Sequence, residues 1–229
     1  MNNLFKALLI VAAVALAWLS YQSVMTPIEF NEKREYREKQ VVARLIDIRT
    51  AETEYRNIKG DYTASLDTLI NWIKTENAKI VLKEGVLTDK QLEAGMTERK
   101  ALQMIEKAKK TGNWKEVEKE GLMNFKRDTT YVPMIESLFG KDYPVDSLRY
   151  IPFSTPHQEF ELEKAEIVTG SAGIKVKVMC AKAPFTSYLN DLDKQELINL
   201  IETTEKLEKY PGVKFGDIEE ANNNAGNWE

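Results

Sequence analysis

Residues 7–28 read ALLIVAAVALAWLSYQSVMTPI, a stretch without a charged side chain. A helix rises about 1.5 Å per residue, so this stretch is long enough to cross the roughly 30 Å of hydrocarbon in a bilayer. Trp18 and Tyr21 are of the aromatic types that concentrate at membrane–water interfaces. We therefore predict that residues 1–28 form a transmembrane signal anchor.

The strictly apolar part of this segment, residues 7–19, is shorter than the uncharged stretch. A cleavable signal peptide has an apolar core of similar length. No clean pair of small residues follows the core, and Trp18 and Tyr21 suit an interfacial anchor. An uncleaved anchor is our prediction, with cleavage as the alternative.

The basic residues on the two sides of the span favour opposite membrane orientations. Lys6 and the amino terminus favour a cytoplasmic N-terminus, whereas five basic residues follow the span and favour the reverse. These five are Lys33, Arg34, Arg37, Lys39 and Arg44. Glutamates interleave with them, and a large domain can be translocated despite its charge. We expect a single-pass protein of the cell membrane whose C-terminal domain is extracytoplasmic (periplasmic), and the reverse orientation stays open.

Composition excludes several classes of function. The 229 residues carry 32 Lys plus Arg against 36 Asp plus Glu, a net charge of −4, so the chain is not a basic nucleic-acid binder. A single cysteine, Cys180, excludes an internal disulfide framework and a cysteine-based zinc site. A single histidine, His157, makes every His-dependent triad depend on that residue.

Residues 30–59 contain no Gly or Pro and favour one long helix. Spacings of three and four predict a stripe that packs on a core. The stripe comprises Arg44, Ile48, Ala51, Tyr55, Ile58 and Tyr62, flanked by Val41, Leu45 and Ile46. The first half of the helix is more polar and would suit a solvated stalk above the membrane; a simple surface helix is the alternative. We expect Gly60 to end the helix, and Ser65 to cap a second one that begins at Leu66.

The segment AETEYRNIKGDYTASLDTL, residues 51–69, carries a resemblance to a known family. It follows a hydrophobic N-terminal helix that runs into an amphipathic one, and in this respect the chain resembles type IV pilins and type II secretion pseudopilins. In those families a helical tyrosine precedes a glycine, an aromatic, a small polar residue and a leucine pair in this order. The likeness covers the first third of the chain, which lacks the prepilin-peptidase motif and a glutamate in its apolar segment.

This resemblance implies an α+β fold in which the N-terminal transmembrane helix continues into an amphipathic helix packed on a small antiparallel sheet. We divide the chain into the anchor (1–28), a stalk helix with its turn and second helix (29–75), a mainly helical insertion (76–128) and an α+β domain (129–229). In the insertion we expect a strand at 79–82, a capping box of Thr88 with Gln91, and a helix capped by Thr97.

The last domain is predicted to be richer in strands. We expect strands at 129–132, 148–153 and 213–215, and a helical turn at 133–139. The alternating segments 159–163 and 174–178 predict a hairpin, with 170–173 as the turn between them. Phe160 and Leu162 occupy even-numbered positions, whereas Ala165 and Ile167 occupy odd-numbered ones, so the two pairs would face opposite sides of one regular strand. We therefore predict a bulge near Glu163 or Lys164. Asp193 with Glu196 caps a helix that ends before Tyr210.

We predict no catalytic, cofactor or metal residues. His157 is interpreted as a surface-loop residue, because no nucleophile motif accompanies it. Cys180 follows an apolar strand pattern and is interpreted as a buried structural thiol. The tail 217–229 offers carboxylates and Asn carbonyls, and major pseudopilins resemble this in carrying a calcium site, but its spacing fits no defined calcium loop.

The sequence thus predicts a non-enzymatic, pilin-like structural or assembly component of an envelope-spanning or surface complex. Its expected partners are the lipid bilayer and other membrane proteins, with self-association open. Four alanines would allow close helix approach in lipid, unless they only face lipid: Ala12, Ala13, Ala15 and Ala17. A membrane-tethered extracytoplasmic binding module is the alternative, and an enzyme that uses carboxylates is the third hypothesis.

Overall fold

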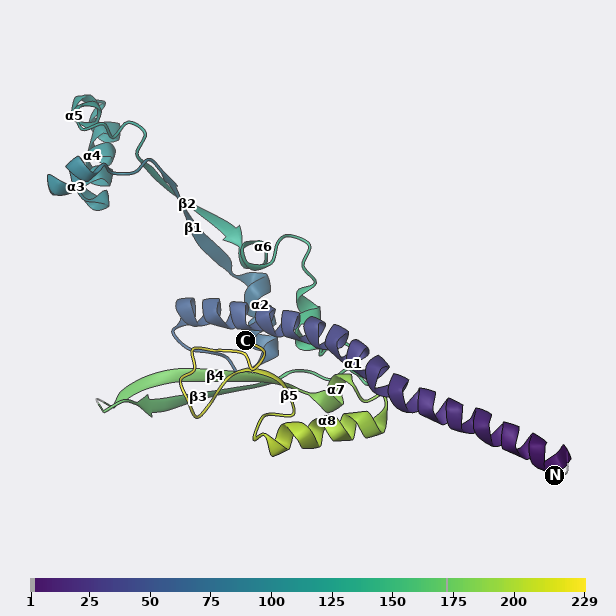
Figure 1. Cartoon of the computed structure of the whole chain (residues 1–229). Helices are drawn as coiled ribbons and strands as arrows, with labels where there is room; N and C mark the ends of the chain where they lie inside the picture. The colour runs from purple at the N-terminus through teal and green to yellow at the C-terminus, as the bar shows by residue number, and fades with distance from the viewer. Residues whose placement is uncertain (1–2, 172) are drawn as a thin grey trace. The chain divides into compact units, whose positions relative to one another are not determined.

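The computed structural model describes residues 3–171 and 173–229, a mixed fold of helices and two small antiparallel sheets (Figure 1). The α-helices are α1 (Asn3–Lys59), α2 (Leu66–Thr75), α3 (Asp89–Glu93), α4 (Glu98–Thr111), α5 (Lys115–Lys119), α6 (Met134–Leu138), α7 (Phe185–Tyr188) and α8 (Lys194–Lys206). The strands are β1 (Asn77–Glu84), β2 (Lys126–Pro133), β3 (Glu161–Thr169), β4 (Ile174–Pro184) and β5 (Gly212–Gly216), and η1 (Val145–Arg149) is a 3₁₀ turn.

The chain forms two compact units, one of residues 1–74 and 142–229 and the other of residues 75–141. The second unit extends beyond the predicted insertion 76–128, because β2 pairs with β1 along its whole length, from Asn77↔Pro133 to Glu84↔Lys126. At the far end of this ribbon, α3–α5 enclose an apolar core of their own. It consists of Leu87, Ala101, Ile105, Ala108, Val117, Leu122 and Phe125.

Helix α1 is continuous through the predicted anchor and stalk, although Pro27 lies inside it. It ends as predicted at Gly60, which has φ +79° and donates its N–H to the carbonyl of Arg56 at 2.8 Å. Ser65 then caps α2, where its hydroxyl accepts the N–H of Thr68 at 3.3 Å. A left-handed residue followed by a polar cap is what a tight turn between two helices requires.

The second half of α1 packs on the three-stranded sheet, and Figure 1 shows the helix running alongside it. Val41, Leu45 and Ile48 are buried as the stripe predicts. Four members of the predicted set are not: Ile46 and Ile58 are 38% and 48% exposed, and Arg44 and Tyr55 are half-buried. Ile46 lies one position from Leu45 and Ile58 is in the last turn, so the helical rotation carries both away from the sheet.

The sheet has the order β3-β4-β5, and the predicted hairpin is present. The predicted bulge is wrong, because β3 and β4 pair one to one through Glu163↔Cys180 and Lys164↔Met179. One of the two residues with the shifted parity, Phe160, lies before β3, next to the isolated bridge Tyr150↔Glu159, and so does not follow the alternation of the strand. The other, Leu162, lies within β3, where it and its neighbour Glu163 are both half-buried.

The predicted strand at 148–153 is also wrong. Its first residues belong to η1, and only Tyr150 bridges to another segment. Pro152 removes a backbone donor, and Ser154 donates its N–H to the carbonyl of Ile151, closing a turn there. Leu148 and Ile151 are buried. A short apolar run looks the same in the sequence whether its residues are buried in a strand or in a turn.

Candidate functional site

The N-terminal half of α1 exposes its apolar side chains. Leu8, Val11 and Leu16, for example, are 62%, 69% and 65% exposed. Within residues 3–171 and 173–229, α1 is the helix that is long and apolar enough to cross a membrane. Burying a Leu or Val side chain is worth about 1.5–3 kcal/mol, so water is an unfavourable surrounding for this segment and lipid or another helix is a favourable one.

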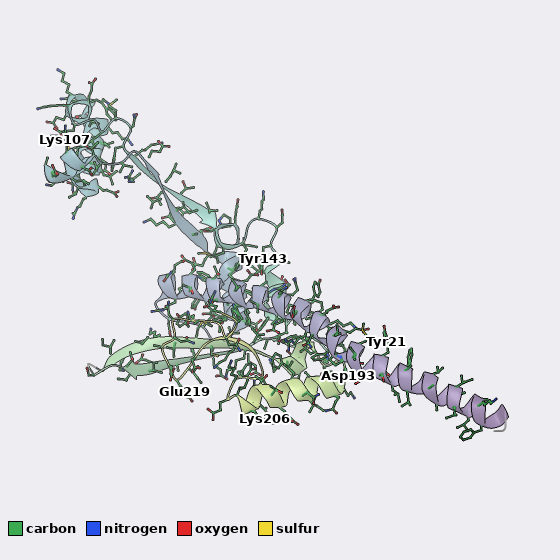
Figure 2. The ribbon with its side chains drawn as sticks, viewed as in Figure 1. Tyr21, Lys107, Tyr143, Asp193, Lys206 and Glu219 are labelled. Atoms are coloured by element: carbon green, nitrogen blue, oxygen red, sulfur yellow. The ribbon has the colours of Figure 1, made fainter. Side chains whose placement is uncertain are left out.

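A cavity of about 380 Å³ opens where α1 leaves the folded unit. It lies between the helix and the loop that precedes α8, and Figure 2 shows Tyr21 and Asp193 near each other at this place. Its walls are formed by Trp18, Tyr21, Gln22, Met25, Thr26, Glu29, Phe30, Lys33, Asp191, Leu192 and Asp193. The cavity thus joins aromatic, polar and charged groups at the end of the apolar helix.

Polar contacts hold the second half of α1 on its unit. Arg37 makes two hydrogen bonds to the carboxylate of Asp191, at 2.5 and 2.8 Å, and a third to the carbonyl of Tyr188 at 2.7 Å. Asp47 accepts the hydroxyl of Tyr143 at 2.5 Å, and Arg49 pairs with Glu229 at 2.5 Å. These contacts were not predicted, since a charge on a helix does not reveal a partner about 100 or more positions away in the sequence.

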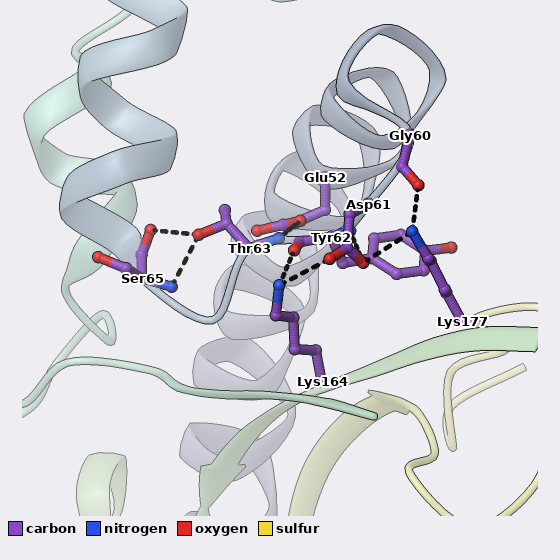
Figure 3. A network of polar contacts seen from close by, with 8 residues as sticks. All are labelled: Glu52, Gly60, Asp61, Tyr62, Thr63, Ser65, Lys164 and Lys177. Carbon is purple, nitrogen blue, oxygen red and sulfur yellow. Dashed lines mark hydrogen bonds and ion pairs between the residues drawn. The ribbon is translucent and has the colours of Figure 1, made fainter. Parts of the chain in front are cut away.

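A polar network surrounds the turn after α1 (Figure 3). Lys164 of β3 donates to the carboxylate of Asp61 at 3.0 Å and to the carbonyl of Tyr62 at 2.8 Å. Lys177 of β4 donates to the carbonyl of Gly60 at 2.7 Å. The hairpin is therefore tied to the helix end through its lysines, a role that sequence alone did not indicate.

Glu52 of α1 contacts this turn and is fully buried. One carboxylate oxygen accepts the N–H of Thr63 at 3.0 Å, and the other, Oε1, has no hydrogen-bond partner. Burial raises the pKa of Glu52 to about 8, opposed by the Thr63 hydrogen bond and by the charge of Lys164. This carboxyl group is thus held largely protonated at neutral pH.

The residues considered for chemistry lie on separate elements. His157 is exposed in the loop before β3, with its ring centroid 5.5 Å from that of Tyr150. Cys180 is buried in β4, and burial raises the pKa of its thiol, which suits the structural role predicted for it. His157 and Cys180 are not hydrogen-bonded to each other, as a nucleophilic thiol and its general base would be.

The C-terminal tail is held in place by pairing. Asn227 donates its N–H to the carbonyl of Lys214 at 3.0 Å, and Phe215 bridges to Gly226. Asp217, from the set considered for calcium, pairs with Lys214 at 2.8 Å. No group of three or more His, Cys, Asp or Glu that could hold a metal ion is present in the part of the chain that the structure describes.

Comparison of the chain with family models, with curated proteins and with solved structures finds no match.

Proposed function

We propose that this protein is a non-enzymatic, single-pass membrane protein that acts as a pilin-like structural or assembly component of a complex at the cell envelope. One observation carries the proposal. A single continuous helix, α1, is apolar and exposed in its first half and packed on an antiparallel sheet in its second. Such a helix transmits lateral contacts made in the membrane to the folded unit without a flexible joint.

The mechanism is lateral packing of α1 against partner helices. In lipid, small side chains allow two helices to approach closely, and Ala12, Ala13, Ala15 and Ala17 provide them. The resemblance of residues 51–69 to pilins and pseudopilins supports the same reading. We place the folded units in the periplasm, whereas partners with similar helices, or further copies of this chain, would meet α1 within the membrane.

Photo-crosslinking in native membranes tests this proposal. A crosslinking amino acid is placed at Ala13 or Ala17, and the matched control places it at Ile198, an exposed residue of α8. We expect specific adducts with membrane proteins from the α1 positions and not from the control. Adducts confined to residues 150–229, or recovery of the mature chain in the soluble fraction without its first two dozen residues, would contradict it.

A second candidate function is a tethered binding module, and the unit of residues 75–141 favours it. This unit has its own core and exposes Val86 and Met123, which are 89% and 58% exposed. If these side chains form a contiguous apolar patch, it would suit an interaction surface. Crosslinks that concentrate at these two residues rather than on α1 would favour the module over the assembly component.

A further inference from the structure

We propose that Glu52 is a proton-operated latch: its neutral carboxyl group keeps the turn of residues 60–65 closed on α1, and loss of its proton opens that turn locally. The inference does not depend on the proposed function, because it concerns a buried acid that the contacts in the membrane do not use. It rests on the burial of Glu52, on the hydrogen bond that this residue makes, and on a separate set of contacts that holds the same turn.

Glu52 holds the turn through one hydrogen bond. It is fully buried on α1, and one of its carboxyl oxygens accepts the N–H of Thr63 at 3.0 Å, as Figure 3 shows. The other oxygen, Oε1, has no hydrogen-bond partner among the residues that the structure describes. A buried carboxylate with one oxygen unpaired is far more costly than the neutral acid. The closed turn therefore favours a bound proton on Glu52.

Lys164 on β3 and Asp61 in the turn act on Glu52 with opposite effects. The ammonium group of Lys164 favours the ionised acid, and the carboxylate of Asp61 disfavours it. Burial is the largest influence, and it raises the pKa of Glu52 to about 8. Lys164 is already engaged, because it donates to the carboxylate of Asp61 at 3.0 Å and to the carbonyl of Tyr62 at 2.8 Å. Ionised Glu52 would therefore have to take this ammonium group from the turn or leave its buried position.

Thr63 links the latch to α2. Its hydroxyl accepts the N–H of Ser65 at 3.1 Å, and the hydroxyl of Ser65 accepts the N–H of Thr68, in the first turn of α2, at 3.3 Å. Release of Thr63 from Glu52 thus loosens the bonds at the start of α2 as well. Since α2 leads directly into β1, the same turn is the covalent connection from α1 to the unit of residues 75–141.

A second set of contacts holds the turn independently of Glu52. Lys164 reaches it from β3, and Lys177 reaches it from β4 through the carbonyl of Gly60 at 2.7 Å. The hydrogen bond from Lys164 holds the pKa of Asp61 below its usual range, so Asp61 stays ionised at neutral pH. These contacts keep the turn attached to the hairpin after Glu52 loses its proton, and the opening is therefore local.

Hydrogen exchange of the full-length protein in detergent tests the latch, with mass spectrometry of peptides that cover residues 60–68. After correction for the intrinsic exchange rate, the protection of these amides should fall about tenfold per pH unit between pH 5.5 and pH 7.5, because each opening releases one proton. In Glu52→Gln the protection should not change over this range, since glutamine has no proton to lose. The matched control, Glu32→Gln at an exposed position of α1, should keep the wild-type slope.

Lys164→Gln separates the latch from the second set of contacts. It should lower the protection of the turn at every pH and keep the slope, because Glu52 still titrates. A slope that persists in Glu52→Gln, or that disappears in Lys164→Gln, would overturn the assignment to Glu52. In the wild-type protein at pH 7.5, the turn should be at least about tenfold less protected than the amides of β4. Equal protection of the two segments would mean that the turn opens only when the whole unit unfolds, and the latch would be refuted.

Discussion

Glu52 shows how a single buried group can make the fold depend on pH. Its Oε1 lacks a partner, and its pKa is about 8 in the folded chain against an ordinary value of 4.5. A raised pKa of a carboxyl group means that ionisation is easier in the unfolded chain. The contribution of Glu52 to stability is therefore complete below about pH 4.5 and is lost as the pH rises toward 8.

We predict that Glu52→Gln removes this dependence. Glutamine has the shape of the neutral acid, so the variant should gain about 3 kcal/mol relative to wild type between pH 5 and pH 7.5. Denaturant unfolding of the full-length protein in detergent at both pH values measures the difference. Glu32→Gln, on an exposed position of the same helix, is the control. Parallel pH profiles for wild type and Glu52→Gln would refute the prediction.

At the scale of the element, α1 behaves as two helices with different surroundings. The first half exposes large apolar side chains, whereas the second buries one stripe and adds the contacts of Arg37, Asp47 and Arg49. Exposed ion pairs contribute little, typically about 0–1 kcal/mol each. The apolar stripe therefore dominates the attachment of α1, and the polar contacts fix its register on the unit.

Leu45 and Ile46 test the contribution of the apolar stripe, because they are neighbours of similar size, one buried and one exposed. Leu45 is fully buried, and Ile46 is 38% exposed. Leu45→Ala should cost about 2–5 kcal/mol through lost burial and the cavity it leaves, and Ile46→Ala should cost clearly less. Denaturant titration of both variants measures the gap. Equal losses of stability in the two variants would mean that α1 does not pack through the stripe that contains Leu45.

At the scale of the whole molecule, each unit has buried apolar residues of its own, so we expect residues 75–141 to be dispensable for the fold of the other unit. Lys74, one of the two ends left by an excision, pairs at 2.6 Å with Asp146, which lies four residues after the other end, Asp142. We therefore expect a short linker to reach between the two ends.

We predict that replacement of residues 75–141 by about eight Gly and Ser residues, which span roughly 16 Å on average, leaves the remaining unit folded. Its melting temperature should change by less than about 4 °C, which corresponds to about 1 kcal/mol for a unit of this size. Circular dichroism melts and membrane fractionation of the excised protein provide the measurement. Loss of cooperative melting would show that the two units depend on each other.

Local signals in the sequence determined most of the elements. The apolar stretch before Glu29, the stop at Gly60, the caps at Thr88, Thr97 and Asp193, and the pairing of β3 with β4 all depend on neighbouring residues, and the structure has them. A helix or turn is decided within a few positions of the chain, so its residues suffice to predict it.

Tertiary structure decided what depends on residues far apart in the chain. The burial of Glu52, the lysines that reach the turn from β3 and β4, and the cavity at the exit of α1 each arise from segments separated by tens to more than a hundred positions. Their spacing leaves no pattern in the sequence. The wrong strand at 148–153 has the same origin, because an apolar run buried by distant partners carries no sign of the conformation in which it is buried.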